Sequence, residues 1–87
     1  MSKQHHHLKC DTGFYQAVEL GIKMFEVRKD DRNFMIGDMI YLEEVAGPAS
    51  TKTGRKQGPF EIIYILEGGK YGIEKGYCVM QLKQAWV

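Results

Sequence analysis

Apolar and polar residues alternate along several short stretches of the chain, which is the pattern of strands with one buried face. The clearest alternation lies in 23–28, where Phe25 and Val27 stand between charged residues. Alternate residues of a strand point to opposite faces, so we expect Phe25 and Val27 in the core. Glu26 and Arg28 should then share the other face. Four more segments show strand character: His6–Cys10, Met39–Val45, Phe60–Glu67 and Tyr77–Lys83.

One segment changes its period from two to that of a helix. Asp11 and Thr12 are good N-cap residues, and behind them an apolar stripe runs through Phe14 and Val18. We expect Gly21 to end this helix in a left-handed conformation. A helix of about two turns is not stable alone in water, so it must pack against the sheet.

Two longer connections separate the strands. The first, 29–38, is polar, and we expect Phe34 and Ile36 to anchor it to the core. The second, 46–59, contains glycines, both prolines and basic residues but no acid, which indicates a long mobile loop or an open hairpin. The strand at 60–67 is apolar on both faces in its middle, so we expect it to be covered on each side.

Five strands with one short helix after the first predict an α+β, mainly β fold. In so small a chain the sheet should curl into a barrel, because closure removes exposed strand edges. With 87 residues the chain forms a single domain over 1–87, with a disordered tail at 1–5 and the flexible loop at 46–59. A formal net charge of +1 provides no global attraction for polyanions, so nucleic-acid binding would need a local patch.

Composition excludes several classes of function. Cys10 and Cys78 lie in expected strands without a C-x-x-C pattern, so we interpret them as reduced core residues. No apolar run approaches the length of a membrane span, so we expect a soluble, cytoplasmic protein without a membrane partner. The sequence leaves the oligomeric state open, with a monomer favoured. The run His5–His7 has no second ligand group at metal spacing, and nothing calls for a metal or cofactor.

Charged residues concentrate in 21–32, and their simplest interpretation is a solvated face. A surface salt bridge between Glu26 and Arg28 would contribute only about 0–1 kcal/mol and have no further meaning. A second basic cluster in 52–56 contains no aromatic residue, so it indicates a solvated loop or at most nonspecific contacts with a nucleic-acid backbone.

The spacing Gly21-x-Lys23-x-x-Glu26-x-Arg28 resembles the signature of the ASCH superfamily, small domains similar to the PUA fold. The likeness continues through 6–9, 14–18, 29–38, 64–68 and 76–80, and is strongest to one ASCH-like family of unknown function that is frequent in bacteria and their phages. It implies a barrel with a cleft between the helix and the barrel mouth. It also implies a role in binding RNA or in handling modified nucleosides. His6 falls in the matched motif, and the resemblance would bring it to the cleft.

In such a cleft the residues suit a nucleotide. Cationic side chains can contact phosphate, and arginine offers bidentate geometry. Glu26 can accept a hydrogen bond from a base amino group, and Tyr71 and Tyr77 beside a glycine-rich loop can stack on bases. The candidate binding set is Lys9, Lys23, Glu26, Arg28, Lys29, Arg32, Tyr71 and Tyr77.

Two alternatives remain open. A related ASCH branch resembles amidohydrolases that act on acetylated cytidine with a lysine, a threonine and a glutamate. Lys23 matches that lysine, but Glu26 stands in the threonine's place and the glutamate-bearing insertion is absent, so a catalytic pair would be Lys23 and Glu26 alone. The other alternative is a protein-interaction module with exposed Met35, Met39 and Trp86.

Overall fold

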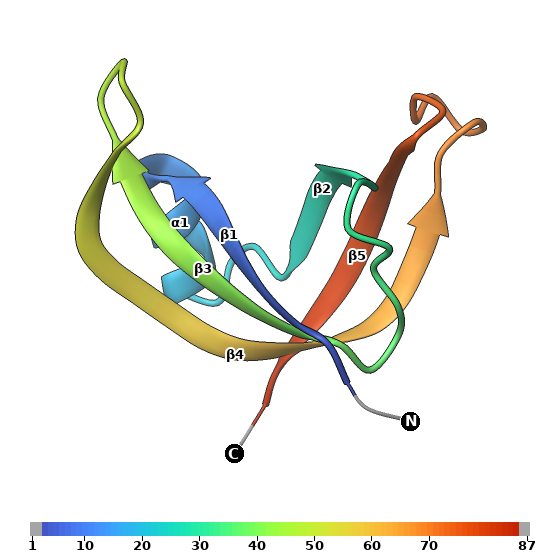
Figure 1. Cartoon of the computed structure of the whole chain (residues 1–87), viewed down its shortest axis with the longest axis horizontal. Coiled ribbons are helices and arrows are strands. Elements are labelled where there is room, and N and C mark those ends of the chain that lie inside the picture. The colour runs from blue at the N-terminus through green and yellow to red at the C-terminus, as the bar shows by residue number, and fades with distance from the viewer. Residues whose placement is uncertain (1–2, 86–87) are drawn as a thin grey trace.

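The strands and the helix follow one another in the predicted order (Figure 1). The elements are β1 (His5–Asp11), α1 (Thr12–Glu19), β2 (Phe25–Lys29), β3 (Met39–Ala46), β4 (Thr51–Glu67) and β5 (Tyr77–Gln84). This computed structural model describes residues 3–85, so the start of the expected tail and Trp86 lie outside the described residues. His5, which was expected to belong to a disordered tail, is the first residue of β1.

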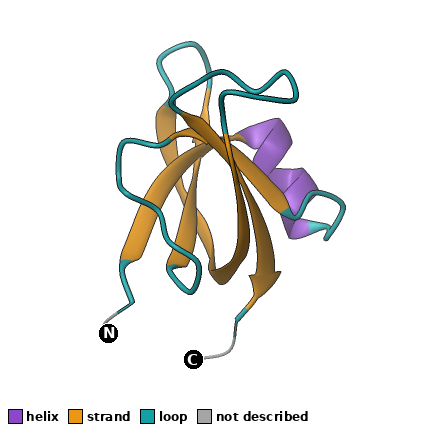
Figure 2. Cartoon of the chain, turned by 90° about the vertical axis from the view of Figure 1, so that its right-hand side faces the viewer, coloured by secondary structure: helices purple, strands orange, loops and turns teal. Residues whose placement is uncertain are grey.

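All five strands form a single sheet in the order β1-β3-β4-β5-β2. β1 runs parallel to β3, and the other neighbours are antiparallel. The register shifts between Ile40 and Leu42, between Glu43 and Val45, and between Ile62 and Tyr64, and such irregularities bend a sheet. The sheet therefore curls into a half-barrel with α1 along one side (Figures 1 and 2), which confirms the predicted mainly β fold.

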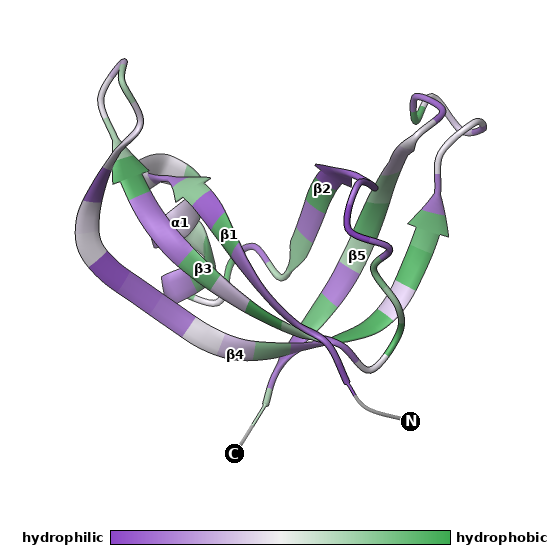
Figure 3. Ribbon diagram, viewed as in Figure 1, coloured by the Kyte–Doolittle hydropathy of each residue, from purple (hydrophilic) through white to green (hydrophobic). Residues whose placement is uncertain are grey.

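The core fills the inside of this curl. Its largest fully buried side chains come from α1 and from four strands: Tyr15, Leu8, Ile40, Leu42, Ile62, Met80 and Cys78. Both cysteines are buried free thiols, as predicted. Figure 3 shows that β4 changes character along its length, hydrophilic in its first half and hydrophobic in its second.

The helix has the predicted length but a different buried stripe. Tyr15 and Val18 are buried, whereas Phe14 is 58% exposed, so its predicted place in the core is wrong. The reason is that the short helix packs on β1 and β3 through its Tyr15 side, and Phe14 then faces a neighbouring pocket. Asp11 occupies the N-cap position without a side-chain cap. Gly21 has φ +76, which confirms the left-handed end.

The predicted parity of β2 is wrong. Phe25 and Val27 are 46% and 53% exposed, whereas Glu26 is only 3% exposed and points inward. Burial of a carboxylate is unfavourable unless it is paired. Glu26 is paired with both Lys23 and Arg28, and these two ion pairs compensate its burial. The charged face of the alternating pattern is therefore the inner one.

The two connections and strand β4 differ from expectation. Phe34 is buried as predicted, but Ile36 is 62% exposed and does not anchor its loop. For 46–59 the sequence left two alternatives, a mobile loop or an open hairpin. Residues 47–50 form a turn and β4 begins at Thr51, so the structure has the hairpin. Tyr64 is 58% exposed, so β4 is not covered on both faces there.

Candidate functional site

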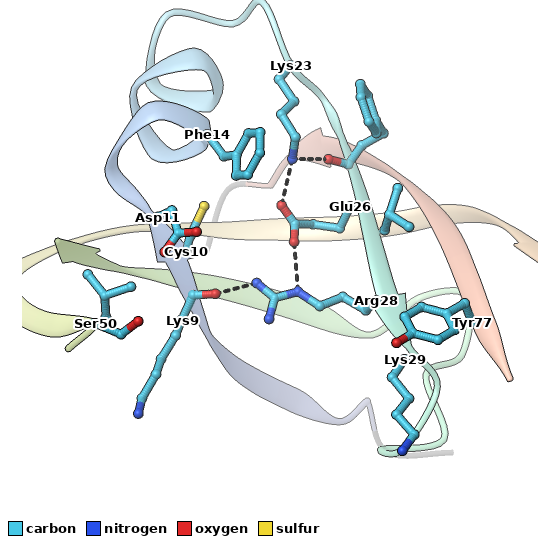
Figure 4. A pocket seen from close by; sticks show the side chains of 13 residues that line it. Lys9, Cys10, Asp11, Phe14, Lys23, Glu26, Arg28, Lys29, Ser50 and Tyr77 are labelled. Carbon is cyan, nitrogen blue, oxygen red and sulfur yellow. Dashed lines mark hydrogen bonds and ion pairs between the residues drawn. The ribbon is translucent and has the colours of Figure 1, made fainter. Parts of the chain in front are cut away.

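A pocket of about 530 Å³ opens between β1 and β2, the two edge strands of the curled sheet (Figure 4). Its walls come from β1, α1, β2 and the beginning of β5, together with the end of β3 and the turn that follows it. We call the gap between β1 and β2 the seam. Because neither edge has a strand partner on the seam side within residues 3–85, side chains or water must satisfy the backbone groups that face it.

Glu26 lies at the centre of the pocket. One carboxylate oxygen is 2.9 Å from Lys23 Nζ and the other is 2.9 Å from Arg28 Nε. The side chain of Glu26 is 4% exposed, against 16% for Lys23 and 27% for Arg28. The carboxylate is therefore held by two cations that retain some contact with solvent, and it fixes the position of both.

Aromatic rings surround the amino group of Lys23. Lys23 Nζ donates a hydrogen bond of 2.7 Å to Phe25 O. It lies 4.9 Å from the ring centroid of Phe25 and 5.6 Å from that of Phe14, distances at which a cation is attracted to a ring face. We call this part of the pocket the aromatic end.

The other end of the pocket is cationic. Figure 4 shows Lys9 and Lys29 extending toward this end on either side of the Arg28 guanidinium, with Tyr77 beside Lys29. Within residues 3–85, neither Lys9 nor Lys29 has an ion-pair partner. Four cationic and two acidic side chains line the pocket, so its local charge is positive although the chain is nearly neutral.

Two arginines cross the seam. Arg28 donates to Lys9 O, and Arg32 Nη1 donates to His7 O over 2.9 Å. These bonds satisfy carbonyl oxygens of β1 that no strand covers. Arg28 thus joins the two edges while it binds Glu26, and Arg32 fastens the loop after β2 to β1.

Cys10 borders the pocket, but its thiol is not poised for chemistry. Burial, followed by the negative charge of Glu26, raises the pKa of Cys10 to about 11, although Lys23 and Arg28 oppose the shift. The thiolate is the nucleophilic form, so at neutral pH this group is unreactive. The described part of the chain holds no cluster of three or more His, Cys, Asp or Glu side chains suited to a metal ion.

The structure brings together six of the eight predicted binding residues, namely Lys9, Lys23, Glu26, Arg28, Lys29 and Tyr77. Arg32 lies at the seam, and Tyr71 is 81% exposed; neither lines the pocket. Sequence reasoning missed Phe14 and Phe25, which it assigned to the core. The available signal for this aromatic end was the position of Lys23, which stands between Phe14 and Phe25 along the chain.

The second basic cluster is mostly neutralised. Lys52 pairs with Glu43 at 3.1 Å, and hydrogen bonding to Lys52 lowers the pKa of Glu43. Arg55 pairs with Glu19 of α1 and lies 3.6 Å from the buried carboxylate of Glu44. These contacts hold the first half of β4 against β3 and the helix, so they are structural.

One other expectation fails, and a second fails in part. His6 is buried, with its Nε2 2.9 Å from Asp38 Oδ2, and it does not line the pocket. Of the proposed apolar interaction surface, Met35 is 50% exposed but Met39 is buried, and Trp86 lies outside the described residues.

These features define a small, mainly β domain with a mixed-charge pocket at the open seam of its sheet. A family model described as "Domain of unknown function (DUF3850)" matches residues 5–82, and the chain belongs to this family. The match begins at the first residue of β1 and ends within β5, so it includes the helix and both walls of the seam. No curated protein matches the chain. Residues 3–85 form no helix of the length and apolarity needed to cross a membrane.

Proposed function

We propose that this protein binds RNA or a free nucleotide in the seam pocket, with the base at the aromatic end and the phosphate at the cationic end. The observation that carries the proposal is the division of one pocket into two ends of different chemistry. A nucleotide has the same division, since a flat aromatic base and an anionic phosphate lie at opposite ends of a sugar.

The size of the pocket supports a ligand of this class. Small-molecule sites commonly enclose about 300–1,000 Å³, with apolar walls and a few polar groups that set orientation. The pocket of about 530 Å³ falls within that range. Phe14 and Phe25 offer surfaces for a base, and Lys9 and Lys29 are free to bind phosphate because they have no ion pair in the described part of the chain.

The resemblance to ASCH domains adds support, because it implies a ligand cleft between the helix and the barrel mouth. Glu26 has a role whether the ligand is RNA or a free nucleotide. Each of its oxygens already accepts one hydrogen bond from a cation, so its first role is to hold Lys23 and Arg28 in place. Each oxygen keeps a second lone pair, which a base amino group can use.

The test is a titration with the four ribonucleoside 5′-monophosphates at low salt, followed by NMR and calorimetry. We expect shifts at residues from β1, α1 and β2, and a loss of about tenfold in affinity for Lys29→Ala and for Phe14→Ala. Lys83→Ala is the matched control, since Lys83 is also exposed but lies outside the pocket. An absence of shifts both with millimolar nucleotide and with a short single-stranded RNA would reject the proposal.

Contact between Lys23 and Glu26 inside the pocket favours a second candidate function, the hydrolysis of an acylated nucleoside. Lys23 Nζ donates to both Glu26 and Phe25 O here, so it must release a proton before it can act as a nucleophile. Incubation with acetylated cytidine tests this function. Turnover that disappears in Lys23→Arg, which keeps a cation beside Glu26 but removes the amine, supports it, and absence of turnover rejects it.

A further inference from the structure

The exposed face of β1 leads away from the cationic end of the pocket. Burial alternates along this strand, so that His5, His7 and Lys9 share its outer face while Leu8 and Cys10 enter the core. Lys9 lines the pocket. His7 and His5 follow it toward the start of the strand, each two residues further on, or about 7 Å at the rise of a strand.

Three rings gather on this face. Tyr41 of β3 lies opposite His7 in the register of the sheet, and the two rings are stacked with centroids 4.8 Å apart and planes at 10°. His5 stacks on the same tyrosine at 5.9 Å and 20°, with its Nδ1 3.3 Å from the tyrosine hydroxyl. Half of the His7 side chain is exposed. This ring cluster (His5, His7 and Tyr41) is an ordered, accessible stacking surface outside the pocket.

Cations lie between the ring cluster and the pocket. Arg32 donates to His7 O, which places its guanidinium beside the cluster, and Lys9 stands on the same strand at the pocket rim. Among residues 3–85, neither has an ion-pair partner. The acid beside the cluster, Glu43, lies 3.9 Å from His7 Nδ1 and also pairs with Lys52 at 3.1 Å. This path therefore combines positive charge with flat rings.

We infer that the ligand of the pocket is one nucleotide of a single-stranded nucleic acid, and that its neighbour stacks on the ring cluster with the linking phosphate beside Lys9 and Arg32. Single strands are bound by the same combination of basic grooves and ring surfaces in many proteins. The inference rests on the proposed function, and it selects an oligonucleotide over a free nucleotide. It also gives Arg32, which does not line the pocket, a place in binding.

The experiment compares the tightest of the four ribonucleoside 5′-monophosphates with a 5′-phosphorylated trinucleotide of the same base. Stacking of one base contributes about 1–3 kcal/mol, so the trinucleotide should bind roughly 5- to 150-fold more tightly. Tyr41→Ala should remove that gain and leave the mononucleotide affinity unchanged. His7→Ala, an exposed position on β1, should act in the same direction. The control Tyr64→Ala, at an exposed tyrosine of β4, should change neither affinity.

The outcomes separate this inference from the proposed function. Equal affinity for the mononucleotide and the trinucleotide, or an equal loss for both in Tyr41→Ala and His7→Ala, overturns the inference while the pocket proposal stands. Unchanged mononucleotide binding shows that each variant is folded. Failure of both ligands to bind the unmodified protein overturns the proposed function and the inference together.

Discussion

Replacement of Glu26 by Gln tests whether the pocket is organised around a buried charge. The substitution keeps the shape of the side chain but removes its charge, and it turns an amide NH2 toward one of two cations that now lie 2.9 Å away. Removal of one partner from a buried ion pair commonly costs about 3–5 kcal/mol. Since Lys23 and Arg28 are 16% and 27% exposed, water recovers part of this loss. We therefore expect a loss of about 2–3 kcal/mol, which lowers the Tm by roughly 10–20 °C.

Urea unfolding measures this loss, and Glu61→Gln provides the control. Glu61 pairs with Lys83 at 4.0 Å, and the lysine side chain is 60% exposed. An exposed pair of this kind contributes little, so the control should change the free energy of unfolding by no more than about 0.5 kcal/mol. In Glu26→Gln combined with Lys23→Met, the loss should be smaller than the sum of the two single losses. A Glu26→Gln effect as small as the control would refute a central buried carboxylate.

Three further predictions concern stability and reactivity. Burial alone would raise the pKa of Asp38, but its hydrogen bonds together outweigh burial and lower that pKa. The stability that Asp38 confers is therefore present above about pH 4 and is lost as pH falls further. The difference in unfolding free energy between the unmodified protein and Asp38→Asn, measured by urea titration, should shrink below about pH 4. At pH 8 a thiol reagent should label Cys10 and Cys78 only after denaturation, because burial raises both pKa values; rapid labelling of the native protein would contradict this. Gly68→Ala places a Cβ against two backbone carbonyl oxygens and should lower the free energy of unfolding by about 2 kcal/mol or more. In Gly13→Ala the added Cβ meets nothing within 4 Å, so this substitution should stabilise the helix by up to about 1 kcal/mol. Thermal melts of both variants measure the two changes.

The order of elements could be predicted because each depends on local sequence. Alternation over five to eight residues, a change to helical period after Asp11 and a glycine at the helix end are all short-range signals. The orientation of β2 could not be obtained in this way. Alternation defines two faces but does not say which is inside, and hydropathy alone favours Phe25 and Val27. The opposite face is buried because Lys23 and Arg28 both reach Glu26 and compensate its burial.

Most of the candidate site was also visible in the sequence, but its assembly depends on distant segments. Lys23, Glu26 and Arg28 belong to one short motif, so a pattern can find them. Their contact with β1 requires the curled sheet to bring its two edges together, which no local pattern specifies. Tyr71 illustrates the limit: it stands close to Tyr77 in sequence, yet it lies in a loop with 81% of its surface exposed.

The open seam explains why the proposed binding site and the fold share residues in this domain. An uncovered strand edge exposes backbone groups that can pair with another chain. Here Lys23, Arg28 and Arg32 each donate to a backbone carbonyl of β2 or β1, so the cations of the site also protect the edges. Alanine at any of these positions would lower binding and stability together, and the two effects could not be separated. Within residues 3–85, the side chains of Phe14 and Lys29 make no hydrogen bond across the seam. A loss of affinity in Phe14→Ala or Lys29→Ala can therefore be attributed to lost contacts with the ligand.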